Sequence, residues 1–221
     1  MRILLTGFLL IAMGGCTPSK NQDSPKKPAG PSAGNAEHGK PLYAVCSACH
    51  GAQGEGNAAL LAPSLANIEG WYLYRQMMNY KKGIRGIARD TLGQQMKAVM
   101  AGMGDSIQMA HVAAYIESLS PVHFASTAAG DIKKGERIYQ TICGSCHGAG
   151  AKGNELMNAP RLNGLEEWYL KRQIKNFQDS VRGSHPDDKL GAQMMAMAAL
   201  LKNDKALNDV VAYIQSTSSS P

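Results

Sequence analysis

The strongest constraint on the fold of this chain is that one stretch of its sequence occurs twice. When residues 46–86 are placed on residues 143–183 without gaps, 19 of the 41 aligned positions are identical. After one inserted residue the match continues, so that Gly-Gln-Gln-Met at 93–96 meets Gly-Ala-Gln-Met at 191–194. An internal repeat of this kind indicates two copies of one small domain in tandem.

Both copies contain the pentapeptide Cys-x-x-Cys-His. This spacing is the attachment signature of c-type haem, in which two thiols bond to the porphyrin and the histidine becomes the proximal iron ligand. A zinc site would need two further ligands in each copy, and a redox-active dithiol would not need the histidine. We therefore predict two covalently bound haem c groups. The predicted attachment and ligand residues are Cys46, Cys49 and His50 in the first copy, and Cys143, Cys146 and His147 in the second.

The sixth iron ligand is predicted from the repeat, because the chain has 12 methionines and most of them should fill the core. An offset of 98 residues pairs Met96 with Met194, whereas an offset of 97 would pair Met100 with Met197. The neighbouring glycine and glutamine matches require the offset of 98. We therefore predict Met96 and Met194 as axial ligands. The histidines outside the two motifs have no histidine counterpart in the other copy, which argues against bis-histidine haems.

The net charge of +6 and the pI of about 9.1 raise the question of nucleic-acid binding. However, residues 36–120 hold seven basic and six acidic side chains, and residues 128–221 hold twelve and ten. No dense basic stripe is present, and the propionates of two haems would compensate most of the excess. We therefore predict no nucleic-acid partner.

The N-terminus resembles a bacterial lipoprotein leader. Residues 1–15 have a basic start, a short apolar run and small residues before Cys16, which predicts a signal peptide and lipidation of that cysteine. The alternative is an ordinary signal peptide that leaves Cys16 as a free thiol. Residues 16–35 are rich in proline and polar residues, which predicts a lipid-anchored disordered tether. The expected location is the periplasm, with the protein held to a membrane as a lipoprotein.

The repeat predicts two tandem all-α domains, at 36–120 and 128–221, which resemble class I cytochrome c domains in their haem motifs. Helical spacing of apolar residues is expected from about residue 37 into the first motif, over 70–82 and over 106–119. The second copy should repeat these helices from about residues 132, 166 and 204. Domains this small bury little core alone, so the haem is expected to supply much of the interior.

These motifs together resemble the dihaem c4-type cytochromes over residues 37–216. The shared features are Cys-x-x-Cys-His-Gly, a Pro-x-Leu loop, a Tyr-Leu-x-x-Gln helix, and a late methionine before a terminal helix ending in Ala-Tyr-Ile. The lipoprotein-like leader departs from the usual soluble form. The resemblance implies that the Pro63 and Pro160 carbonyls hold the second ring nitrogen of the two proximal histidines.

Three further pairs in the repeat have two possible roles each. Arg75 and Arg172, with the glutamines that follow them, either hold haem propionates or lie on an exposed helix face. Trp71 and Trp168 are expected to pack against a haem edge or the core.

The resemblance implies an electron carrier rather than an enzyme. The donor would be a quinol-oxidising complex or a dehydrogenase, and the acceptor a terminal oxidase or reductase. The alternatives are a peroxidase-like dihaem enzyme, the cytochrome subunit of a periplasmic dehydrogenase, and a component of an outer-surface electron conduit. A catalytic haem needs an open sixth position, and two equivalent methionine ligands argue against one.

Overall fold

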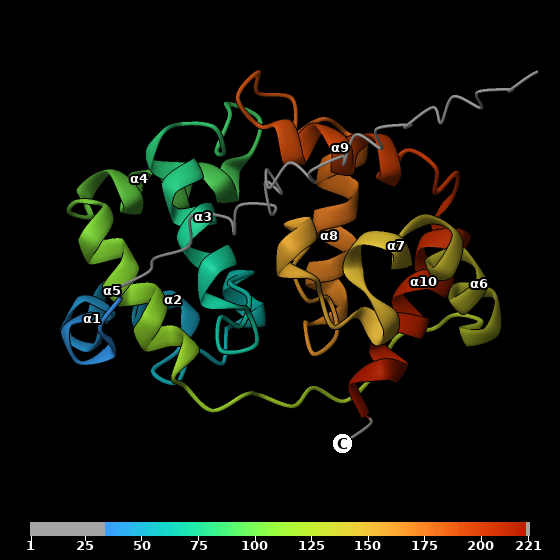
Figure 1. The fold of residues 1–221 in the computed structure, drawn as a ribbon, viewed down its shortest axis with the longest axis horizontal. Coiled ribbons are helices and arrows are strands. Elements are labelled where there is room, and N and C mark those ends of the chain that lie inside the picture. The colour runs from blue at the N-terminus through green and yellow to red at the C-terminus, as the bar shows by residue number, and fades with distance from the viewer. Residues whose placement is uncertain (1–33, 220–221) are drawn as a thin grey trace, which may run out of the picture.

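The chain folds into two helical domains that lie side by side, as seen in a computed structural model that describes residues 34–219 (Figure 1). The predicted signal peptide and Cys16 lie outside the described residues. Within the described range there is no strand, only two isolated bridges, Asn57 with Ala62 and Asn154 with Ala159. None of the helices in this range is long and apolar enough to cross a bilayer. The expected all-α fold is confirmed.

The two domains repeat the same order of five α-helices, and the second domain has two additional 3-10 helices, η2 and η4. The first contains α1 (Ala36–Leu42), α2 (Ala44–His50), η1 (Ala58–Leu60), α3 (Gly70–Lys81), α4 (Thr91–Gly102) and α5 (Ser106–Glu117). The second contains α6 (Ile132–Ile142), α7 (Gly144–His147), η2 (Ala149–Ala151), η3 (Glu155–Met157), α8 (Glu167–Gln178), α9 (Lys189–Ala198), α10 (Asp204–Ser216) and η4 (Thr217–Ser219). Helices α3 and α8 face each other at the centre of the molecule, and the linker runs along one edge (Figure 1).

Each domain is closed by its first and last helices, which cross at a glycine. A Cβ atom on Gly39 would overlap the His111 carbonyl, and one on Gly135 would overlap the Asp209 carbonyl. Only a residue without a side chain allows the helix pairs α1–α5 and α6–α10 to come this close. The first and last α-helices of each domain are therefore in close contact, and the haem motif follows directly after the first of them.

The expected helix from residue 37 into the first motif is divided in the structure. Helix α1 contains Pro41 and ends at Leu42, and α2 starts one residue after Tyr43. Proline has no N–H to continue the helical hydrogen bonds. The glycine crossings place Arg137 at the position of Pro41, and α6 runs on to Ile142. The second copy is nevertheless divided as well, at Cys143 inside the motif, where α7 begins.

Helices α4 and α9, which carry Met96 and Met194, were not assigned from the sequence. Both begin with an aspartate whose side chain accepts from a backbone N–H three residues later. The Asp90 carboxylate accepts from Gly93 N at 2.8 Å, and the Asp188 carboxylate from Gly191 N at 2.9 Å. Each aspartate thus satisfies one of the unpaired donors of the first turn.

The linker is fastened to the domain interface by Asn67. Its side-chain nitrogen donates to the carbonyl of Val122 in the linker at 2.6 Å and to that of Gly164 in the second domain at 2.5 Å. Its side-chain oxygen accepts from the Val122 N–H at 2.8 Å. One buried amide therefore holds the linker and both domains together.

Candidate haem sites

The two motif histidines occupy the same environment in the two domains. His50 ends α2 and His147 ends α7, and both are buried, with 6% and 5% of their surface exposed. The Nδ1 atom lies 2.8 Å from the Pro63 carbonyl oxygen in the first domain and 2.7 Å from the Pro160 carbonyl oxygen in the second. These are the carbonyls that the resemblance to c4-type cytochromes implies.

The hydrogen bond fixes the state of each ring. A carbonyl oxygen only accepts, so Nδ1 of His50 and of His147 must carry the hydrogen, which leaves a lone pair on Nε2. Burial lowers the pKa of both histidines, although the proline carbonyls partly oppose it. Both imidazoles are therefore neutral at pH 7 and able to bind a metal through Nε2.

A buried tyrosine holds the turn that follows each motif. The Tyr43 hydroxyl donates to the Gly51 carbonyl at 2.8 Å, and the Tyr139 hydroxyl donates to the Gly148 carbonyl at 2.7 Å. Both glycines have positive φ, 82° and 75°, which a residue with a side chain rarely adopts. The chain can therefore turn sharply beside each histidine.

The four motif cysteines differ in exposure within each pair. Cys46 and Cys143 are half-buried, whereas Cys49 and Cys146 are exposed. Burial raises the pKa of Cys46 and Cys143 to about 11, so these thiols are protonated at pH 7. Residues 34–219 contain no group of three or more histidine, cysteine or acidic side chains placed to hold a metal ion. The donor sets thus do not match a zinc site.

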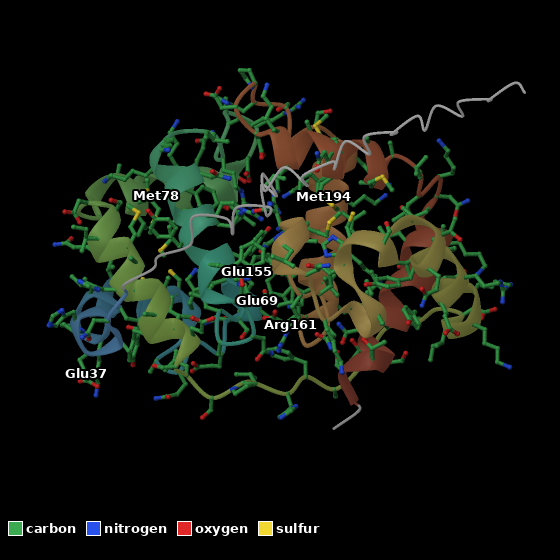
Figure 2. The ribbon with its side chains drawn as sticks, viewed as in Figure 1. Glu37, Glu69, Met78, Glu155, Arg161 and Met194 are labelled. Atoms are coloured by element: carbon green, nitrogen blue, oxygen red, sulfur yellow. The ribbon has the colours of Figure 1, made fainter. Side chains whose placement is uncertain are left out.

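A cavity of about 310 Å³, lined mostly by the second domain and in part by α3 of the first, brings the predicted haem residues of the second domain together. Its walls include both motif cysteines, His147 and Met194, with Met197 also on the wall. Met194 belongs to α9 and lies on the side of that helix toward α8 (Figure 2). In the first domain Met96 is half-buried against the core, and Met100 is a core residue with 1% of its surface exposed.

Neither expected role of the two helix arginines describes them fully. Arg75 donates to the side-chain and backbone oxygens of Asn158 at 3.1 and 3.0 Å, and Arg172 donates to the Leu61 carbonyl at 2.9 Å. Asn158 and Leu61 are equivalent residues in the left-handed conformation. Each arginine thus fastens a loop of the opposite domain.

The two tryptophans support these arginines. The Arg75 guanidinium lies 4.8 Å from the centre of the Trp71 ring, and the Arg172 guanidinium lies 4.7 Å from that of Trp168. At this distance a cation is attracted to the ring face. Both tryptophan rings are half-buried. They therefore pack as expected and, in addition, contact the interface arginines.

Arg85 and Arg182 are functional candidates that the sequence reasoning missed. Each is 6% exposed, and each donates through Nη1 to a glutamine of its own domain, Gln76 at 2.7 Å and Gln173 at 2.6 Å. Arg182 also reaches the Tyr72 hydroxyl of the first domain at 3.1 Å. The only available signal was the Arg-Gly dipeptide at the same place in both copies.

These arginines test whether the site fits a haem. All their hydrogen-bond acceptors in the described residues are neutral, and the Nε atoms of Arg85 and Arg182 are buried without a partner. A buried cation without an anion is costly, so both call for a carboxylate. Arg182 lines the mostly apolar cavity that holds His147 and the thiols. A haem, with an apolar ring, two propionates and two thiol attachment points, fits this donor set.

Comparison with known proteins gives one consistent result. The cytochrome c family model matches residues 36–120 and 132–218. Cytochrome c4 of Azotobacter vinelandii is 32% identical over 197 residues, covering 83% of this chain and 89% of that protein. A thiosulfate dehydrogenase electron acceptor of Thiomonas intermedia is 33% identical over 198 residues, with 82% of each chain covered. The solved structure of reduced recombinant cytochrome c4 from Pseudomonas stutzeri aligns with a TM-score of 0.66 at 28% identity, covering 83% of this chain and 98% of that one.

Proposed function

We propose which residues attach and ligate the two haems of this chain. The chain belongs to the cytochrome c family and is a dihaem electron carrier of the c4 type, with two covalently bound haem c groups. In the proposal Cys46 and Cys49 attach the first haem, and Cys143 and Cys146 the second. Bound haem iron supplies a one-electron couple, and the protein sets its potential through the axial ligands and their surroundings.

The proposed axial ligands are His50 with Met96 and His147 with Met194. The single observation that carries the proposal is the hydrogen bond from Nδ1 of each buried histidine to a proline carbonyl, which directs a free Nε2 lone pair away from the loop. The cavity shared by His147 and Met194 supports the second pair. A histidine and a methionine together fill both axial positions, so this arrangement favours electron transfer over substrate chemistry.

Arg85 and Arg182 are the proposed partners of the propionates. Both guanidiniums are buried and have an unpaired Nε, so a carboxylate would complete their hydrogen bonds and balance their charge. Arg75 and Arg172 are less suited, because their terminal nitrogens already donate to the opposite domain.

The proposed place of work is the periplasm, with the donor a dehydrogenase or quinol-oxidising complex and the acceptor a terminal oxidase or reductase. The relative from Thiomonas intermedia, named an electron acceptor of thiosulfate dehydrogenase, supports a dehydrogenase as donor. That name also favours a second candidate, in which the chain is the cytochrome subunit of such a dehydrogenase. The proposed lipid anchor at Cys16 lies outside the described residues.

The test is a combined haem count and redox titration of the purified protein. The proposal expects two haems per chain, low-spin spectra in both redox states, and reversible uptake of two electrons. Turnover of peroxide with an external electron donor would contradict it and favour the enzymatic alternative. Stable co-purification with a dehydrogenase would favour the subunit role over that of a diffusing carrier.

A further inference from the structure

One peptide unit in the first domain lies between its histidine and a carboxylate of the second domain. The Pro63 carbonyl accepts from Nδ1 of His50 at 2.8 Å. The N–H of the same peptide unit, on Ser64, donates to Oε1 of Glu166 at 2.7 Å. A continuous chain of hydrogen bonds therefore runs from a carboxylate of one domain to the histidine ring of the other.

The second domain contains the same arrangement in the opposite direction. The Pro160 carbonyl accepts from Nδ1 of His147 at 2.7 Å, and the Arg161 N–H donates to Oε1 of Glu69 at 2.8 Å. Figure 2 places Glu69 and Arg161 together at the domain interface. Because each glutamate belongs to the domain opposite its histidine, the two relays cross the interface in both directions.

Hydrogen bonding alone does not explain why both positions hold a carboxylate. The second oxygen of Glu69 and of Glu166 is buried without a hydrogen-bond partner. Burial raises the pKa of both carboxyls, although the hydrogen bond from Arg161 or Ser64 partly opposes it. A glutamine would accept the same N–H without the cost of burying a charge. The negative charge itself is therefore the feature to be explained.

A charge at this place can act on the iron ligand. A carboxylate that accepts from a peptide N–H polarises that peptide and makes its carbonyl a stronger acceptor. A stronger acceptor on Nδ1 makes a metal-binding histidine more basic. A more basic ligand favours the oxidised metal ion, so the charge lowers the reduction potential.

We propose that Glu166 and Glu69 each tune the proximal histidine of the opposite domain, through the 63–64 and 160–161 peptide units respectively. The proposal rests on the proposed ligation by His50 and His147. Each haem potential would then depend on the other domain being docked, because the relay of hydrogen bonds starts in that domain. The glutamates are positioning residues, because they act through a peptide and a histidine.

The experiment replaces each glutamate by glutamine, which keeps the acceptor and removes the charge. Midpoint potentials come from spectroelectrochemical titration, and each haem is identified by the ligand-methyl resonance that disappears in Met96→Ala or Met194→Ala. Glu69→Gln should raise the midpoint potential of the second haem by about 59 mV. For a one-electron couple this shift corresponds to a tenfold change in the ratio of reduced to oxidised haem at a fixed potential. Glu166→Gln should do the same for the first haem.

The matched control is Glu117→Gln. The Glu117 carboxylate accepts from Gly70 N at 3.1 Å and lies near Glu69, but it is not linked to a histidine. Its replacement should leave both potentials unchanged. A second variant, Glu69→Asp, keeps the charge and shortens the side chain away from the Arg161 N–H. The relay predicts that it resembles Glu69→Gln, whereas a simple field effect predicts that it resembles the wild type.

A second readout is the Nδ1 proton of the proximal histidine, observed by NMR in the reduced protein. Weakening the relay at Glu69 should move the His147 resonance upfield and leave that of His50 in place. The proposal is wrong if Glu69→Gln moves the first haem, moves both equally, or moves neither. Failure of the ligation proposal would look different, because the wild type itself would then lack low-spin haem spectra.

Discussion

Arg182 of the second domain donates a hydrogen bond to the Tyr72 hydroxyl of the first domain at 3.1 Å. The tyrosine is neutral, so this contact does not balance the charge of the guanidinium. The same guanidinium reaches Gln76, which also accepts from Arg85. Two buried cations therefore share one neutral acceptor at the interface. Each guanidinium also lies 4.3 Å from the centre of an aromatic ring, Tyr80 for Arg85 and Phe177 for Arg182. An anion would balance the two charges, and this is the role proposed for the haem propionates.

Replacement of Arg182 by glutamine should lower the midpoint potential of the second haem. A positive charge near the iron disfavours the oxidised state, so its loss stabilises that state. It should also lower the free energy of unfolding by about 3 kcal/mol or more, because a propionate would remain buried without its partner. Redox titration and thermal unfolding measure the two effects. Arg89→Gln is the control, since Arg89 also donates across the interface, to Ser180, but is exposed.

Substitution of the crossing glycines should destabilise each domain separately. Gly39→Ala and Gly135→Ala place a methyl group against a backbone carbonyl, and overpacking of this kind costs about 1–3 kcal/mol. Thermal unfolding followed by circular dichroism measures the loss. Gly102→Ala is the control, because a Cβ atom there meets nothing within 4 Å. If Gly39→Ala is as stable as Gly102→Ala, the close crossing of α1 and α5 is wrong.

The buried glutamates predict a pH dependence of stability. Burial raises the folded-state pKa of Glu69 and Glu166 above the unfolded value. A raised pKa gives a contribution to stability that is present below the unfolded pKa and is lost as pH rises through the folded pKa. Glu166→Gln should therefore match the wild type at low pH and exceed it at pH 7. Unfolding in urea at several pH values measures this, and a less stable variant at pH 7 would contradict the assigned direction.

The sequence predicted the haem motifs, the repeat and the second-helix boundaries because each depends on local residues. It did not predict α4 and α9, although Asp90 and Asp188 are typical N-cap residues followed by a glycine three positions later. In α4 the apolar residues Leu92, Met96 and Met100 do follow helical spacing, so a helical signal was present there and was overlooked.

The division of the helix that leads into each motif was not predicted either. It lies at Tyr43, two residues after Pro41, in the first copy and at Cys143 in the second.

The interface contacts could not be predicted for a different reason. Arg75, Arg182 and Glu69 each match an identical residue in the other copy, so the sequence marks them as shared. Their partners across the interface, however, lie 83 to 110 residues away, and only the docking of α3 against α8 brings them together. Two roles were therefore open for Arg75, and the structure assigns a third.

Carbon monoxide binding to the reduced protein tests most directly whether this chain is a carrier with filled axial positions. If Met96 and Met194 ligate iron, the wild type should take up almost no carbon monoxide, and Met96→Ala and Met194→Ala should each bind one equivalent. Met195→Ala, which removes a neighbouring methionine of α9 that does not line the cavity, should behave as the wild type. Rapid binding of carbon monoxide by the unmodified protein would show an open iron and contradict the account.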